Sequence, residues 1–208
     1  MLGENLFADP IALSCQAIIG GHTAQIDTMR CNGKLSLLLV GLGYETDMIS
    51  YADRQEKDNA GVVAYLKGFA NALADNTPFE ATISVDDNAP QTITTVSIVV
   101  ANAAPSFSVL AQGGGKPDVS DGLLDLTWIK HVDSPITNLS TMLELFRANP
   151  DRMGDYIAHQ QVHSLKIETS QPMPYVIDGE VLESTPIEIE CCPSSLKVMV
   201  LEQAVNGG

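Results

Sequence analysis

The sequence predicts a mainly β protein of the α+β class: a two-layer β-sandwich of about ten strands with two or three flanking helices. Two observations carry this prediction. Short runs rich in β-branched residues recur along the chain, and Asn-Gly, Asp-Gly or Asp-Asn turns separate several of them. Helical periodicity is restricted to brief segments between these runs. With 208 residues, 45% of them hydrophobic, residues 1–208 are expected to form a single globular domain.

The predicted elements follow one another in a simple order. Strands are expected at residues 22–30, 35–40, 80–85, 92–100, 123–130, 163–169, 175–177, 187–191 and 196–201. Helices are expected at residues 11–19, 62–73 and 139–146. The first helix has Asp9 as its N-cap and Pro10 in its first turn, and the pair Asn32-Gly33 joins the first two strands.

The charge balance excludes several classes of partner. Eleven Lys and Arg residues against 26 Asp and Glu residues give a net charge of −15 at pH 7, which repels nucleic-acid phosphates and anionic lipid headgroups. No nucleic-acid partner is therefore expected. No apolar run reaches the roughly 20 residues that span a bilayer, and the N-terminus lacks the pattern of a secretory signal. The sequence predicts a cytoplasmic protein whose four cysteines are reduced.

Acidic clusters in three predicted turns are the candidate sites. Asp118 and Asp121 follow a glycine-rich bend and offer oxygen ligands of the kind that Mg²⁺ or Ca²⁺ prefers; the alternative is a solvated turn capped by an aspartate. Asp178 and Glu180 would lie on the same side of an extended chain, as a carboxylate pair that shares a proton transfer. Their alternative is a plain hairpin turn. The third cluster, at residues 86–88, is interpreted as surface.

Two other patterns fall short of a site. His159 and His163 have the spacing of metal ligands on a helix, but the glutamate of a zinc protease motif is missing between them. Gly41 and Gly43 follow an apolar run as in a dinucleotide-binding loop, but the third glycine of that loop is missing. From its residues alone, the chain is an acidic β-rich domain without a self-sufficient active site.

Eight short motifs, taken together, point to a family. They are the segments 20–27 (GGHTAQID), 32–33 (NG), 41–47 (GLGYETD), 57–65 (with Lys57, Gly61, Ala64 and Tyr65), 100–102 (VAN), 113–115 (GGG), 121–125 (DGLLD) and 178–180 (DGE), with Thr185-Pro186 behind the last. Their order and gaps resemble those in the C-terminal domain of the bacterial diacylglycerol kinase and lipid kinase family. The resemblance extends from about residue 9 to residue 201.

This resemblance implies a two-domain parent architecture. In that family an N-terminal Rossmann-like domain carries the Gly-Gly-Asp-Gly-Thr loop that binds ATP, and the C-terminal β-sandwich closes over it to form a cleft. The loop does not occur in this sequence. The N-terminal nucleotide-binding domain is therefore expected to be absent, as in a fragment, a truncated gene product or one half of a split enzyme.

The resemblance also implies roles for individual residues. Asp178 would be the general base that takes the proton of the lipid hydroxyl, with Glu180 assisting, and Lys57 would link the metal loop to the nucleotide site. A structural Mg²⁺ would be held by the Asp121 side chain and by the main-chain carbonyls of Asp118 and Leu123.

The sequence departs from the family beside this implied metal loop. Ser120 stands where an acidic residue is usual, which removes one charge, and Lys116 adds a positive charge nearby. Both changes would weaken the binding of a cation.

The leading hypothesis is the lipid-acceptor and catalytic-base domain of an ATP-dependent lipid kinase that phosphorylates a diacylglycerol-like hydroxyl. Its expected cofactors are Mg²⁺ and ATP, the latter bound mainly by the missing domain. Its expected partners are an acyl lipid at the membrane surface, a nucleotide-binding domain in cis or trans, and a second copy in a homodimer. Two alternatives remain open: a non-catalytic lipid-binding or regulatory module that has lost the kinase half, and an unrelated β-sandwich interaction domain.

Overall fold

The computed structural model describes residues 9–43, 77–103, 118–130, 157–182 and 184–202. One helix, α1 (Pro10–Gly20), precedes the strands. Six strands form the first sheet: β1 (Thr23–Cys31), β2 (Lys34–Ser36), β4 (Phe79–Val85), β5 (Gln91–Thr95), β9 (Ser164–Thr169) and β12 (Ile187–Met199). Six more form the second sheet: β3 (Leu39–Gly43), β6 (Ser97–Ala101), β7 (Leu124–Ile129), β8 (Ile157–Val162), β10 (Tyr175–Ile177) and β11 (Glu180–Leu182).

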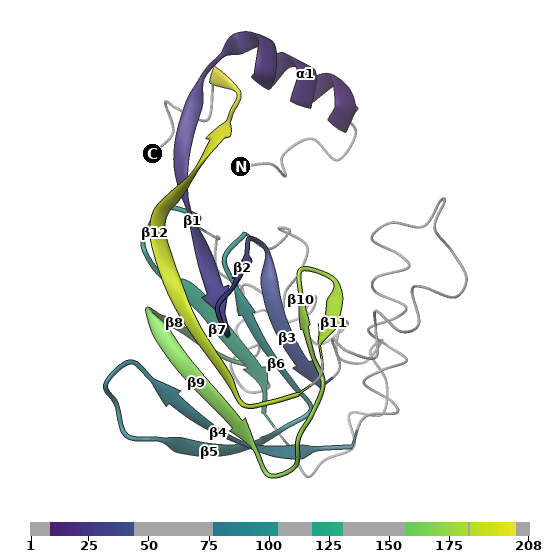
Figure 1. The fold of residues 1–208 in the computed structure, drawn as a ribbon, viewed down its shortest axis with the longest axis vertical. Coiled ribbons are helices and arrows are strands. Elements are labelled where there is room, and N and C mark those ends of the chain that lie inside the picture. Colours follow the sequence, from purple (N-terminus) through teal and green to yellow (C-terminus); the bar gives the residue numbers. More distant parts are fainter. Residues whose placement is uncertain (1–8, 44–76, 104–117, 131–156, 183, 203–208) are drawn as a thin grey trace, which may run out of the picture.

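The two sheets pack face to face as a β-sandwich (Figure 1). The first has the strand order β2-β1-β12-β9-β4-β5, and the second has the order β11-β10-β3-β6-β7-β8. Neighbouring strands are antiparallel in both sheets. The predicted two-layer sandwich is confirmed.

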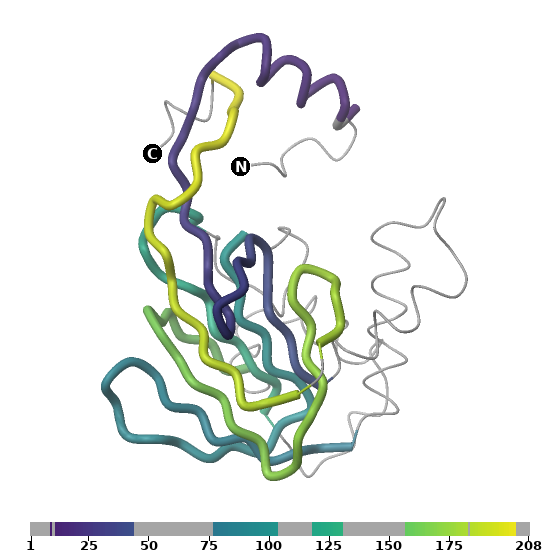
Figure 2. The backbone as a smooth tube through the Cα atoms, viewed as in Figure 1, coloured from purple at the N-terminus to yellow at the C-terminus, as the bar shows by residue number. Residues whose placement is uncertain are grey.

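The helix α1 begins and ends as its sequence predicts. The Asp9 carboxylate accepts a hydrogen bond from the Ile11 backbone N–H at 3.0 Å, and Gly21 ends the helix in the left-handed conformation, with φ of 69°. The helix lies beyond one end of the sandwich rather than on its flank, on an arm formed by the adjoining ends of β1 and β12 (Figures 1 and 2). The other two predicted helices, at residues 62–73 and 139–146, lie outside the described residues.

Two runs predicted as single strands are each divided between the sheets. The run 35–40 ends its pairing with β1 at Ser36 and resumes at Leu39 as β3 of the other sheet. The run 92–100 divides at Val96 into β5 and β6. At this second break the Thr95 hydroxyl donates to the main-chain oxygen of Ile129 at 2.7 Å and accepts from the Ser97 N–H at 3.2 Å. These bonds satisfy buried polar groups where the chain changes sheet.

In the C-terminal third, two runs that were predicted as separate strands form a single long strand. The runs 187–191 and 196–201 belong to β12, which pairs with β1 on both sides of a bulge between Ile26 and Thr28. Such a bulge keeps a long strand continuous while bending it. The strand β8 was not predicted, because polar residues occupy its centre, where three consecutive residues are exposed. His159 and His163 therefore lie on and just after a strand, and their helical spacing has no structural counterpart.

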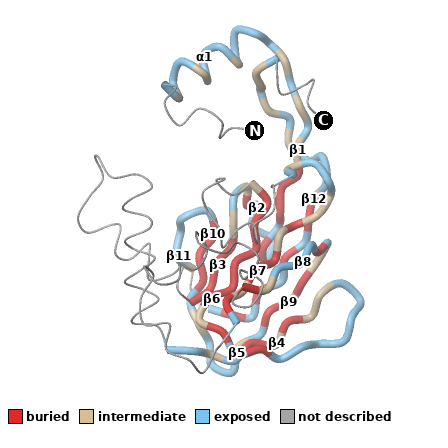
Figure 3. The backbone as a smooth tube through the Cα atoms, turned by 180° about the vertical axis from the view of Figure 1, so that it is seen from behind, coloured by how far each residue is buried: buried red, intermediate tan, exposed pale blue. Residues whose placement is uncertain are grey.

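The core fills the space between the sheets, and Met29, Leu126 and Ile167 are fully buried in it. The central strands of the second sheet are buried on both faces, whereas its edge strands β8 and β11 are partly exposed. All five residues of β6 are also buried, so both faces of this strand are covered (Figure 3). Gly43 has no room for a side chain: its φ is 75°, and an added Cβ would lie 2.4 Å from the Val96 carbonyl oxygen.

Candidate functional site

Three of the motifs that carry the family resemblance, at residues 100–102, 121–125 and 178–180, meet at one end of the second sheet. In the order β10-β3-β6-β7-β8, alternate strands run in opposite directions. The ends of β10, β6 and β8 therefore lie at the same edge as the starts of β3 and β7. The segments 118–123 and 178–179 and residue Asn102 all lie at this end, which is also the end from which the α1 arm extends (Figure 1).

Asp178 holds the turn between β2 and β3. It occupies the β10–β11 turn with φ of 47°, and its Oδ1 accepts hydrogen bonds from the Ser36 hydroxyl and from the N–H groups of Leu38 and Leu39, at 2.9 to 3.0 Å. Its Oδ2 accepts one bond, from the Leu37 N–H at 2.7 Å. The carboxylate is thus fixed in position, and Oδ2 retains more capacity to accept a proton than Oδ1.

Asn102 connects this turn to strand β1. Its Nδ2 donates to the main-chain oxygens of Asp27 and Leu37, at 2.8 and 3.1 Å, and its own N–H donates to the Leu38 carbonyl at 3.0 Å. The residue is 2% exposed, and its Oδ1 has no hydrogen-bond partner among the residues that the structure describes. Such an unsatisfied buried acceptor is unusual in a native fold.

Asp27 continues the network to the predicted metal loop. This carboxylate is 1% exposed. Its Oδ2 accepts from the Gly122 N–H at 2.7 Å, and its Oδ1 accepts from the Ser194 N–H at 2.6 Å. Its backbone N–H donates to the Val119 carbonyl at 2.7 Å. A continuous chain of hydrogen bonds therefore runs from the Asp178 turn through Asn102 and Asp27 to the loop 118–123.

Within that loop the predicted metal ligands are engaged with protein donors. Asp118 Oδ1 accepts from the backbone N–H and the hydroxyl of Ser120, at 3.0 and 2.8 Å. Asp121 accepts from the Leu123 N–H through Oδ1 and from Gln161 Nε2 through Oδ2, at 2.9 and 2.8 Å. In the described ranges no group of three or more His, Cys, Asp or Glu side chains could hold a metal ion.

Two histidines of β8 and the following turn lie beside this loop. His159 Nε2 is 2.8 Å from Asp125 Oδ1, and these side chains are 28% and 14% exposed. Burial raises the pKa of the Asp125 carboxyl above its ordinary value of 3.8, although the hydrogen bond and charge of His159 oppose the shift. His163 Nδ1 donates to the Gly122 carbonyl at 2.9 Å. The unpredicted strand β8 thus supplies side chains that support the loop.

The structure does not bring all the predicted site residues together. Glu180 is exposed at the start of β11, and the turn at Asp178 and Gly179 separates it from the Asp178 carboxylate, so the two do not share one extended segment. Lys57 lies outside the described residues. In the sequence, Asp27 and Asn102 belong to family motifs but have no predicted role. Their burial and their hydrogen bonds in the structure identify them as parts of the candidate site.

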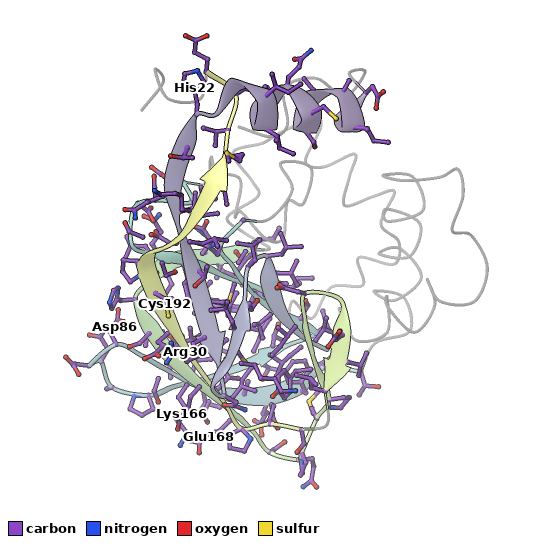
Figure 4. All side chains as sticks on the ribbon, turned by 45° about the horizontal axis from the view of Figure 1, so that its top comes forward. His22, Arg30, Asp86, Lys166, Glu168 and Cys192 are labelled. Atoms are coloured by element: carbon purple, nitrogen blue, oxygen red, sulfur yellow. The ribbon has the colours of Figure 1, made fainter. Side chains whose placement is uncertain are left out.

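A separate groove crosses the outer face of the first sheet. Its volume is about 460 Å³, and Arg30, Asp86 and Lys166 are among its lining residues. Figure 4 labels these three side chains, which come from different elements of that sheet and its turns. The Asp86 carboxylate accepts from the N–H groups of His163 and Ser164, at 3.1 and 2.7 Å, so the turn predicted as plain surface also has a structural contact. Of the predicted site residues that the structure describes, none lines this groove.

The comparison with protein families is decisive for the resemblance. The family model "YegS C-terminal NAD kinase beta sandwich-like domain" matches residues 39–200. The chain belongs to this family. The resemblance to the C-terminal domain of lipid kinases is thereby confirmed, and the YegS-type domain is a lipid kinase-like C-terminal domain.

Individual relatives agree with this assignment. An uncharacterized protein of Synechocystis sp. is 38% identical to the YegS-type domain over 189 residues, which cover 89% of this chain and 43% of that protein. A Staphylococcus aureus protein named a putative lipid kinase is 22% identical over 197 residues, covering 89% of this chain and 60% of that protein. The chain therefore spans less than two thirds of the length of these relatives.

Solved structures show the same fold. A crystal structure described as a putative diacylglycerol kinase from Bacillus anthracis superposes with a TM-score of 0.61 at 20% identity, covering 90% of this chain and 60% of that chain. A further Bacillus anthracis structure with the description "putative diacylglycerol kinase" gives 0.59 at 21% identity. At these identities the likeness supports the sandwich architecture. Among the described residues, no helix is long and apolar enough to cross a bilayer.

Proposed function

We propose that this chain is the lipid-acceptor and catalytic-base domain of an ATP-dependent lipid kinase, with a diacylglycerol-like alcohol as acceptor. The observation that carries the proposal is the hydrogen-bond network between the Asp178 turn and the loop 118–123. It holds the implied base and the implied metal loop in one rigid arrangement. Phosphoryl transfer depends mostly on positioning and charge neutralisation. The network would supply the positioning, and a cation held by the loop would supply the neutralisation.

In this proposal Asp178 takes the proton of the acceptor hydroxyl. Its Oδ2 carries a single hydrogen bond, from the Leu37 N–H, and can accept a proton there. As the proton leaves, the acceptor oxygen forms a bond to the γ-phosphorus of ATP. The bond from this phosphorus to the β–γ bridging oxygen breaks, and ADP departs. Glu180, exposed one residue beyond the turn glycine, would assist from the adjacent strand.

The Mg²⁺ of the proposal would be held by the Asp121 carboxylate and the main-chain carbonyls of Asp118 and Leu123. Each Asp121 oxygen accepts one protein hydrogen bond and keeps a lone pair for a cation. Bound there, the ion would neutralise negative charge near the phosphates. Lys57 would connect this loop to the nucleotide site, which a nucleotide-binding domain in cis or trans would provide. The protein would act in the cytoplasm and touch the membrane surface transiently.

A non-catalytic lipid-binding or regulatory module is the second candidate. One observation favours it: the Asp178 carboxylate already accepts four hydrogen bonds that stabilise a turn, so a structural role alone would account for its presence. The two functions differ in whether nucleotide chemistry accompanies lipid binding.

Transfer of labelled γ-phosphate from ATP to lipid tests the proposal. The chain is assayed with Mg²⁺ and diacylglycerol, alone and with the nucleotide-binding domain of a relative. Activity is expected only in the mixture, and it should fall at least about a hundredfold in Asp178→Asn if the carboxylate is the general base. Asp87→Asn is the matched control, because it makes the same change at an exposed residue of the turn between β4 and β5, outside the implied site. Lipid binding with no transfer in any mixture would favour the non-catalytic module.

A further inference from the structure

Exposed apolar side chains lie next to Asp178, at the same end of the sandwich. Leu35 on β2 is 65% exposed, Leu38 in the following turn is 40% exposed, and Val181 on β11 is 46% exposed. We call these three residues the apolar rim. The other large apolar side chains that are exposed in the described part of the chain lie on the arm, on α1 and at the end of β12.

Hydrogen bonds attach the apolar rim to the Asp178 carboxylate. The Leu38 N–H donates to Oδ1 at 2.9 Å, and Ser36, the neighbour of Leu35, donates to the same oxygen at 2.9 Å. Val181 follows Asp178 by three residues in the same hairpin. A surface that covered the rim would therefore lie at a fixed distance from this carboxylate.

The rim is built on edge strands of both sheets. β2 is the edge of the first sheet and β11 the edge of the second, and the Asp178 contacts hold the turn after β2 against the β10–β11 hairpin. Each edge strand carries one charged residue, Lys34 on β2 and Glu180 on β11, as edge strands of soluble proteins usually do. Beside each charge lies an exposed apolar side chain, Leu35 or Val181, that is available to an apolar surface.

The charges at the rim indicate which apolar surface this is. Lys34 precedes Leu35 on β2, and Glu180 precedes Val181 on β11; both are exposed. One cation and one anion beside an apolar rim complement the phosphate and the ammonium of a zwitterionic headgroup. The net charge of −15 disfavours an anionic surface.

We propose that the apolar rim docks onto a zwitterionic bilayer and so brings the hydroxyl of an embedded lipid to Asp178. The inference rests on the proposed function, because it places the acceptor membrane at the predicted base. Leu35, Leu38 and Val181 enter the headgroup boundary, while Lys34 and Glu180 remain with the headgroups. Asp178, fixed behind the rim, then faces the interface at which a lipid hydroxyl is presented.

Co-flotation of the full chain with phosphatidylcholine vesicles tests the docking surface, with and without diacylglycerol in the bilayer. The variant Leu35→Ser/Val181→Ser is compared with Ile19→Ser/Met199→Ser, which changes two side chains of the arm that are 85% and 52% exposed. The rim variant should lose vesicle binding about tenfold, equivalent to about 1.4 kcal/mol. The arm variant should change it less than about twofold, and phosphatidylserine vesicles should bind more weakly than phosphatidylcholine vesicles.

Several results would overturn the docking surface. Equal loss in the rim and arm variants would show that exposed apolar area in general binds the vesicles. Unchanged binding in the rim variant, or preference for phosphatidylserine, would contradict the assignment directly. Sedimentation of a wild-type dimer that the rim variant converts to a monomer, without vesicle binding, would assign the rim to a second copy. Because flotation needs no ATP, failed phosphate transfer with normal rim-dependent flotation would refute the proposed function and leave the docking surface standing.

Discussion

Replacing Asp178 tests how strongly one carboxylate holds the candidate site together. Alanine at this position removes the acceptor for one hydroxyl and three backbone N–H groups. Hydrogen bonds to a charged group contribute roughly 1.5 to 3 kcal/mol each when buried. Here Leu38 is exposed and Leu37 is partly exposed, so water can replace the carboxylate and the loss per bond is expected nearer about 0.5 to 1 kcal/mol.

These terms predict a total loss for Asp178→Ala of about 3 to 5 kcal/mol in the free energy of unfolding. The four bonds account for about 2 to 4 kcal/mol, and alanine at a φ of 47° adds about 1 kcal/mol, because its Cβ meets the carbonyl in the left-handed region. Asp178→Asn should lose less, about 1 to 2 kcal/mol, because the amide oxygen keeps the Oδ1 bonds and asparagine tolerates this φ. Its amide nitrogen would instead face the Leu37 N–H.

Urea denaturation followed by circular dichroism measures this loss at pH 7. A domain of this size should also melt about 2 to 4 °C lower for each kcal/mol. Glu180→Gln, an exposed change on β11, should stay within about 0.5 kcal/mol of the wild type. If Asp178→Ala were as stable as Glu180→Gln, the carboxylate would not hold the β2–β3 turn, and the argument for a rigid network would fail.

Three other predictions concern burial and strain. Gly43→Ala should destabilise the fold by at least about 2 kcal/mol in urea, because the new Cβ meets backbone at 2.4 Å and φ is 75°. Burial raises the pKa of Asp125 from 3.8, so the folded state binds this proton more tightly than the unfolded state. The stability of the wild type relative to Asp125→Asn should therefore fall as pH rises from 3.8 through the raised pKa. Burial raises the pKa of Cys31 to about 12 and of Cys191 to about 11, while Cys15 is exposed, so a thiol reagent at pH 8 should modify Cys15 first.

Each of these has a clear contrary result. A Gly43→Ala chain as stable as the wild type would mean that the backbone beside it moves at little cost. A wild type that gains stability relative to Asp125→Asn as pH rises would show a lowered pKa for this carboxyl. Because Cys192 is partly exposed, a rapid phase of thiol modification that persists in Cys15→Ser/Cys192→Ser would show that one of the two buried cysteines is reached by solvent.

Short-range features of the fold were predictable, because neighbouring residues decide them. The Asp9 cap and the Gly20-Gly21 stop specify α1, and Asn32-Gly33 specifies the first hairpin, with Asn32 at φ of 47° and Gly33 at φ of 80°. Side-chain oxygen at an N-cap and glycine at positive φ have these preferences whatever the rest of the chain does. The runs of β-branched residues likewise predicted strands.

The same reasoning could not find where the chain changes sheet. Residues 92–100 are uniformly β-forming, yet the chain changes sheet at Val96, where the Thr95 hydroxyl bonds a carbonyl 34 residues away. Conversely, Pro193 and Ser194 predict an end of strand, but they lie in a bulge of β12, where residues 193–195 stand opposite the single residue Asp27 and the strand continues beyond them. Strand propensity indicates that a residue fits the half-buried surface of a sheet, but it does not indicate to which of two sheets the residue belongs.

The candidate site, like the fold, has some features that the sequence determined and others that only the tertiary structure decided. The sequence by itself determined the turns, the strand composition and the ordered motifs by which the chain resembles lipid kinases, since all of these are written in neighbouring residues. Only the tertiary structure decided that Asp178 bonds the Leu37 N–H, 141 residues away, and that Asp27 joins Gly122 and Ser194, 95 and 167 residues away. Contacts at such separations depend on the register and packing of two complete sheets, and no local preference encodes them.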